Sequence, residues 1–174
     1  MITLAVLVSV GVGATVAQKA SVSPQTPRYI AARYDKSGDF PSPDRRFIAR
    51  LTHAEGDTKT LTIHTVTRGK PLLKSLIIAE TDIHNVQWVP RQLHSLLIGV
   101  NGIYNPNPRL VLWRGGNTLR TLTADKTALL FVIKDISSNG RIVRYERRGE
   151  SDLQDTQRTP LRSLSLTPFL SKAP

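Results

Sequence analysis

Hydrophobic residues along this chain alternate with polar ones or gather in short runs, and Gly, Pro, Asn and Asp stand between the runs. Alternation with a period of two is typical of half-buried β-strands, whereas a helix needs apolar residues at spacings of three and four. No window from Arg28 onward keeps the helical spacing. The sequence therefore predicts an all-β fold of antiparallel β-meander repeats. The expected strands are Arg28–Tyr34, Phe47–Thr52, Thr60–Val66, Leu72–Ile78, Ile83–Val89, Ser95–Val100, Arg109–Trp113, Thr118–Leu122, Ala128–Lys134, Arg141–Arg147 and Leu161–Leu166.

Turn-forming residues mark the connections between these strands. Ala54–Asp57 and Ser137–Gly140 are typical of hairpin turns, and the Asn-Gly pair of the second suits positive φ at both central positions. We expect a loop at Asp35–Asp44 because it is dense in turn formers. Asn101–Pro108 is expected to be a longer loop, since its prolines cannot donate ladder hydrogen bonds.

A repeated segment organises the chain. Arg114–Leu122 has a degenerate copy at Arg68–Leu76, about 46 residues earlier, in which Arg, Gly and two leucines recur at the same spacing. A weaker third copy stands at Leu161–Leu164. One small meander cannot bury its own faces, so we expect the repeats to stack against each other.

Val86–Pro90, Leu96–Val100 and Arg109–Trp113 together resemble one blade of a β-propeller of the WD40 or TolB-like kind. In those blades an aromatic residue followed closely by Pro closes the inner strand, and an apolar strand ending in Trp leads to the outer one. The resemblance implies a partial β-propeller of two or three blade-like units. Arg114 stands where an Asp usually follows the Trp. Because a propeller closes with four or more blades, a β-trefoil and a β-sandwich remain alternatives.

The N-terminal segment Ile2–Ala17 is apolar and carries no charged side chain. It is too short for a comfortable membrane span and suits the hydrophobic region of a secretory signal peptide, cleaved near Ala17. An uncleaved anchor and a buried segment are the alternatives. We therefore predict a signal peptide over residues 1–17, a flexible linker over 18–27, a β-repeat domain over 28–170, and a secreted or periplasmic protein.

Charge is the strongest compositional signal. The chain has 24 Lys and Arg against 13 Asp and Glu, a formal net charge of +11, which favours attraction to acidic partners. If the repeats stack in register, basic residues at equivalent positions would form a basic face; without a partner, the same residues are a solvated surface. This predicted basic face consists of Arg68, Lys70, Lys74, Arg114, Arg120, Arg141, Arg144 and Arg147.

Motifs for catalysis or metal binding are missing from the sequence. There is no Cys, and His53, His64, His84 and His94 form neither an H-x-x-x-H nor an H-E-x-x-H pair. No G-x-S-x-G elbow is present, and Asp35–Asp39 lacks the spacing of an EF-hand loop. We expect no metal, no cofactor and no enzymatic activity, and we expect Trp88 and Trp113 to anchor the core.

The sequence thus favours an exported, non-enzymatic binding or scaffolding module with a basic face. The expected partner is a protein or an acidic polymer such as a cell-envelope polymer or glycan; nucleic acid is disfavoured for an exported chain. Open sheet edges would also permit self-association. The alternatives are a hydrolase whose site the sequence does not reveal and a propeller fragment without independent function.

Overall fold

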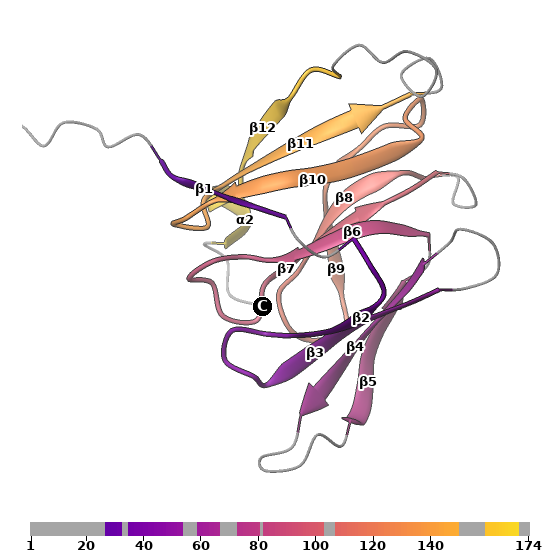
Figure 1. The fold of residues 1–174 in the computed structure, drawn as a ribbon, viewed down its shortest axis with the longest axis vertical. Helices are drawn as coiled ribbons and strands as arrows, with labels where there is room; N and C mark the ends of the chain where they lie inside the picture. The colour runs from indigo at the N-terminus through magenta and orange to yellow at the C-terminus, as the bar shows by residue number, and fades with distance from the viewer. Residues whose placement is uncertain are drawn as a thin grey trace, which may run out of the picture.

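The computed structural model describes residues 27–32, 35–53, 59–66, 73–80, 82–102, 107–149 and 159–170, with backbone only for 73–80. Within these ranges the chain forms twelve strands and one short helix, and the strands pair antiparallel in three four-stranded sheets (Figure 1). The all-β prediction is confirmed. The signal peptide predicted for residues 1–17 lies outside the described residues, as does all of the predicted linker but its last residue.

Each sheet is named here by its place in the chain. The N-terminal sheet has the order β2 (Gly38–Pro41), β3 (Phe47–His53), β4 (Lys59–Val66) and β5 (Leu73–Glu80). The central sheet has the order β6 (Ile83–Trp88), β7 (Leu96–Val100), β8 (Arg109–Trp113) and β9 (Leu119–Ala124). The C-terminal sheet has the order β1 (Tyr29–Ala31), β10 (Leu130–Ser137), β11 (Ile142–Arg148) and β12 (Arg162–Ser165), and helix α2 (Thr167–Leu170) follows it.

The central sheet is buried on both faces, between the other two (Figure 1). On β7, Leu96 and Ile98 belong to the hydrophobic core shared with the N-terminal sheet, whereas Leu97 belongs to the core shared with the C-terminal sheet. This double burial explains why β7 is a continuous apolar run rather than an alternating one. Trp88 and Trp113 are buried in the first of these cores, which confirms their expected role as anchors.

The repeat found in the sequence leads into equivalent strands in two of the sheets. β5 begins at Leu73 and β9 at Leu119, and each is the fourth strand of its meander. The third copy differs, because β12 pairs with β11 and so takes the third place after β10. β1 then adds to the free edge of β10. The C-terminal sheet therefore combines strands from the two ends of the described chain.

Two segments differ from the sequence expectation. The predicted loop Asp35–Asp44 contains β2, which pairs with β3 along its whole length. Asp39 stabilises this strand by accepting two hydrogen bonds from Arg50, at 2.6 and 2.7 Å, and Phe40 O accepts one from Trp88 Nε1 at 3.1 Å. Helix α2 was also not expected. The described strands close no barrel and form three sheets rather than two, unlike the β-trefoil and β-sandwich alternatives.

The C-terminal and central sheets approach each other closely at two glycines. A Cβ at Gly99 would overlap the carbonyl oxygen of Phe131 in β10, and a Cβ at Gly140 would overlap that of Pro90. Of the Asn-Gly turn predicted at Ser137–Gly140, only Gly140 has positive φ, 70°. Gly140 N–H donates to Ser137 O at 2.8 Å, so the turn is tight as predicted but positive φ is confined to its last residue.

None of the described helices is long and apolar enough to cross a membrane.

We expect Gly99→Ala to destabilise the protein by about 3 kcal/mol, because the added methyl group would push two packed sheets apart. Gly116→Ala is the matched control. Gly116 has no neighbour within 4 Å of an added Cβ, and only its φ of 68° opposes the substitution, at about 1 kcal/mol. Urea denaturation of both variants measures the difference; equal losses would contradict the close-packing account.

Candidate functional site

Turns from all three sheets meet at one end of the molecule, on the left in Figure 1. His94, in the turn after β6, contacts Asp44, in the turn after β2, through Nε2 and Oδ2 at 2.6 Å. Ser138 N–H, in the turn after β10, donates to Arg28 O at 2.6 Å, and Gly140 packs against Pro90. We call this surface the turn end; it comprises residues 28, 42–46, 90–95, 114–118 and 138–141.

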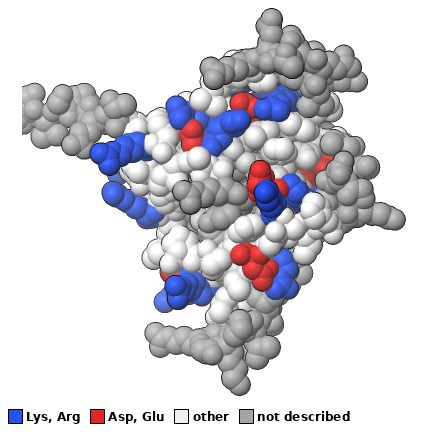
Figure 2. All heavy atoms as spheres, viewed as in Figure 1, with Lys and Arg blue, Asp and Glu red and all other residues white. Residues whose placement is uncertain are grey.

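The turn end is strongly basic. Four of its arginines are exposed and have no acidic partner among the described residues: Arg28, Arg45, Arg91 and Arg141. Asp44 is the one acidic residue within these segments. Figure 2 shows blue side chains along this edge, whereas most blue groups elsewhere on the same face lie beside red ones.

Asp44 is turned inward and does not neutralise these arginines. Its side chain is 17% exposed, and it accepts hydrogen bonds from Ser42 Oγ at 2.6 Å and from the Arg46 N–H at 3.3 Å. Burial alone would raise the pKa of Asp44, but the hydrogen bonds from Ser42, the Arg46 N–H and His94 hold this pKa below its usual value. The lowered pKa favours the charged carboxylate, which links the turn after β2 to the turn after β6 through its contact with His94.

Aromatic packing fixes the same turns to the core. The His94 ring lies edge-on to Phe47, with centroids 4.8 Å apart, and Phe47 lies edge-on to Trp113 at 4.9 Å. Such edge-to-face pairs favour one relative orientation of the rings. The turns after β2 and β6 are thus held in a defined position relative to each other.

Strained backbone is concentrated here. Arg45, Arg91 and His94 have φ of 57°, 59° and 56°, the left-handed region that residues with a Cβ seldom adopt. Among the described residues one other non-glycine residue, Asp82, has positive φ. Each of these backbone conformations is unfavourable by itself, so the surrounding contacts must stabilise it.

Two residues of the predicted basic face bind the C-terminal helix. Arg114 Nη1 donates to Phe169 O at 3.1 Å, and the Arg120 guanidinium lies 4.8 Å from the centre of the Phe169 ring. Phe169 in turn packs against the core below the C-terminal sheet. These arginines therefore have an intramolecular role.

Two others, Arg144 and Arg147 on β11 of the C-terminal sheet, are paired with acids. Arg144 donates two hydrogen bonds to Asp135, each 2.6 Å long, and lies over the Tyr29 ring at 3.8 Å. Arg147 Nε lies 2.5 Å from Asp125 Oδ2, and Nη2 bonds Thr127 Oγ1. Their positive charges are largely compensated within the molecule.

The remaining predicted residues divide between the turn end and undescribed positions. Arg141 lies at the turn end. Arg68 and Lys70 lie outside the described residues, and Lys74 is in β5, of whose side chains nothing is described. The structure thus brings Arg114, Arg120 and Arg141 to one region around α2, and it places Arg144 and Arg147 further along β11.

Sequence reasoning missed Arg28, Arg45 and Arg91. A signal for two of them was present, since the first and third turns of an antiparallel meander lie at the same end of the sheet. Arg45 and Arg91 occupy first turns, as Arg141 does, and Arg114 occupies a third turn. Strand order places Arg91 and Arg114 at one end of the central sheet, whereas grouping them with Arg45 and Arg141 also requires the stacking of the three sheets.

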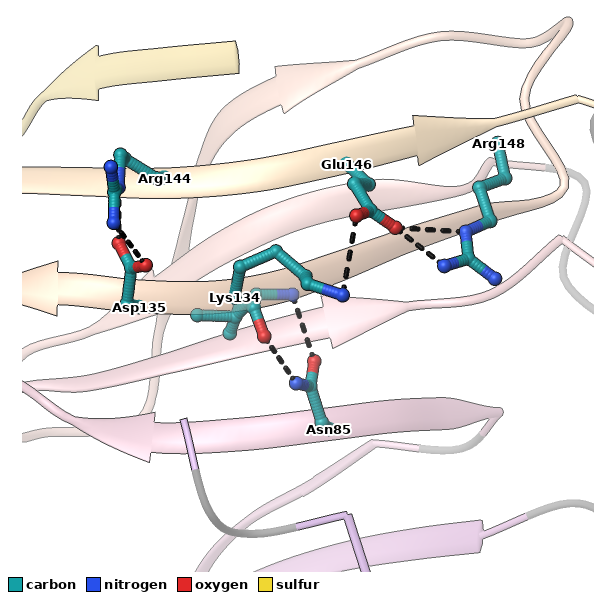
Figure 3. Close-up of polar contacts among 7 residues, drawn as sticks. Asn85, Lys134, Asp135, Arg144, Glu146 and Arg148 are labelled. Carbon is teal, nitrogen blue, oxygen red and sulfur yellow. Dashed lines mark hydrogen bonds and ion pairs between the residues drawn. The ribbon is translucent and has the colours of Figure 1, made fainter. Parts of the chain in front are cut away.

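An ion-pair network covers the outer face of the C-terminal sheet (Figure 3). Glu146 lies between two cations, 3.2 Å from Lys134 Nζ and 2.5 Å from Arg148 Nη2, and Asp135 pairs with Arg144 beside it. On the N-terminal sheet, Asp39 and Arg50 pair in the same way. The described side chains of these two sheets thus include several paired charges.

The described residues contain no group of three His, Asp or Glu side chains that could hold a metal ion. Ser42, Asp44 and His94 form a chain of contacts, but Asp44 stands in the middle and accepts a hydrogen bond from the Ser42 hydroxyl. A serine nucleophile needs His next to Ser, with the acid on the far side of the ring. These three residues therefore link two turns, and their order does not allow His94 to act as a base for Ser42.

No family model, no curated protein and no solved structure matches this chain.

Glu146 makes a testable contribution to acid stability. Burial opposes its ionisation, but hydrogen bonds from Arg148 and Lys134 outweigh burial and lower the pKa of Glu146 below its usual 4.5. A group with a lowered folded-state pKa stabilises the fold above the unfolded pKa, and the contribution is lost as pH falls through the folded value. We expect stability to fall less between pH 6 and pH 3 in Glu146→Gln than in the unmodified chain, measured by urea denaturation. Parallel stability profiles would contradict this prediction.

Proposed function

We propose that this chain is an exported, non-enzymatic binding module, built of blade-like β repeats, that holds an acidic partner at the turn end. The observation that carries the proposal is the row of exposed arginines, Arg28, Arg141, Arg91 and Arg45, contributed in turn by all three sheets. Guanidinium groups bind phosphate, sulfate and carboxylate groups through paired hydrogen bonds. A row of four such groups suits a partner with repeated anionic groups.

Rigidity supports a binding role. The arginine-bearing turns are joined by the Asp44–His94 contact and by the packing of Gly140 on Pro90. Side chains mounted on fixed turns lose less conformational entropy on binding than side chains on mobile loops. The turn end can therefore act as a preformed surface.

The blade-like description rests on the four-stranded meanders that pack face to face and on the repeat that leads into β5 and β9. The export proposal rests on the apolar segment Ile2–Ala17. For an exported chain the acidic partner would be a cell-envelope polymer, a layer of lipid headgroups, a glycan or an acidic protein surface.

We expect the double variant Arg91→Gln/Arg141→Gln to elute from immobilised heparin at lower salt than the unmodified chain. Removing one arginine that pairs with an anion should reduce the slope of log K against log salt by about one, so the double variant should show a slope smaller by about two. Elution across a salt series, with circular dichroism to check folding, measures this.

The matched control is Lys36→Gln/Lys126→Gln, which removes the same charge from two exposed residues near the opposite end of the strands. It should keep the salt slope almost unchanged. Equal effects of the two double variants would mean that net charge, rather than the turn end, governs binding, and would refute the proposal.

A further inference from the structure

We infer that the acidic partner is the surface of an anionic lipid bilayer, on which the turn end docks with Leu93 entering the headgroup region; this inference rests on the proposed function. Leu93 is 68% exposed, the most exposed large hydrophobic residue of the described chain. It lies in the turn between β6 and β7, two residues after Arg91.

The position of Leu93 matters more than its exposure, because single exposed leucines are common on protein surfaces. Arg91 stands on its own turn, Arg141 on the turn that packs against Pro90, and Arg45 next to Asp44, the partner of His94. A second exposed apolar residue, Ile30 at 38%, follows Arg28 by two positions. Exposed apolar side chains thus lie close in the chain to arginines that have no acidic partner within the described ranges.

A soluble polyanion offers nothing to an exposed leucine, whereas an anionic bilayer offers both charge and an apolar layer. Peripheral proteins bind such surfaces through combined basic and apolar side chains. Arginine suits the boundary, since its alkyl stem can lie against apolar groups while the guanidinium reaches a phosphate. The observed combination therefore favours a lipid surface over a soluble polymer.

The turn that carries Leu93 is held in place from within. Val89 N–H donates to Ser95 O at 2.9 Å, Gln92 N–H donates to Val89 O at 3.2 Å, and Ser95 Oγ donates to Leu93 O at 3.3 Å. His94, the next residue, is fastened to Asp44. Leu93 is thereby presented on a fixed turn, so insertion would order little additional backbone.

The test measures binding of the full chain to sedimented vesicles of phosphatidylcholine with and without phosphatidylglycerol. We expect tighter binding to the anionic vesicles than to phosphatidylcholine alone. On the anionic vesicles we expect a loss of about tenfold for Leu93→Ser and about fivefold for each of Arg91→Gln and Arg141→Gln. Heparin binding of Leu93→Ser should be unchanged. Every variant retains the apolar segment Ile2–Ala17, so differences between variants report on the turn end alone.

The absence of cysteine from the chain allows a local probe. Leu93→Cys carrying an environment-sensitive fluorophore should show a blue-shifted emission when anionic vesicles are added. Lys126→Cys, in the turn after β9 at the opposite end, should show no shift.

The outcomes separate the two proposals. Anionic-vesicle binding that depends on Leu93, with a shift confined to the probe at that position, supports the inference. Heparin binding without vesicle binding, or vesicle binding indifferent to Leu93, overturns the lipid inference and leaves the polyanion module standing. Failure to bind either vesicles or heparin overturns both.

Discussion

The side-chain amide of Asn85 joins two sheets that have no strand in common, and the rest of the structure depends on this contact. Asn85 Nδ2 donates to Ile133 O at 2.7 Å, and Asn85 Oδ1 accepts from the Ile133 N–H at 3.1 Å (Figure 3). Along this edge of β10, the β1 segment supplies hydrogen bonds from Ser137 to Lys134. The Asn85 amide bonds the next residue, Ile133, where a neighbouring strand would otherwise do so. Buried backbone N–H and C=O groups without hydrogen-bond partners would cost free energy. By bonding both groups of Ile133, Asn85 offsets that cost where the two sheets approach closely at Gly99.

The position of the turn end follows from that contact. Once β10 is fixed against the central sheet, its turn reaches the Pro90 turn, and Gly140 fits beneath the Pro90 carbonyl. The Asp44–His94 contact then continues the row into the N-terminal sheet. Four arginines distant in sequence become neighbours because three sheets are stacked in one fixed register, and a looser stack would scatter them.

Much of this architecture could be predicted from the sequence. A strand buried on one face alternates apolar and polar residues, and this alternation is visible in a single sequence. The predicted strands from Phe47 to Leu122 agree with the structure to within a few residues, and the repeat matches β5 to β9, which hold equivalent places in two different sheets. β2 was missed because Gly38 and Pro41 are turn formers; its strand is stabilised by Arg50 and Trp88, which lie far along the chain. Such contacts have no local signal.

The site was predicted less well, and electrostatics explains why. Arg144 and Arg147 have the same local sequence signal as a surface arginine, yet Asp135 and Asp125 lie against them only in the folded sheet. Counted from the sequence, Arg144 and Arg147 contribute two positive charges to the basic face. In the structure the neighbouring aspartates largely compensate these charges. The turn arginines were overlooked for the opposite reason, since their separation in sequence hides their proximity.

This difference also decides which surface can act on a partner. An arginine already paired with a carboxylate would have to give up that pair before it bound another anion, so the net gain would be small. Arg28, Arg45, Arg91 and Arg141 have no such pair among the described residues, so in the proposed complex they would exchange only water for the partner. Among the described residues, four arginines without an acidic partner lie at the turn end, whereas Arg144, Arg147 and Arg148 on β11 are already paired. The proposed binding surface is therefore the turn end rather than the face of the C-terminal sheet.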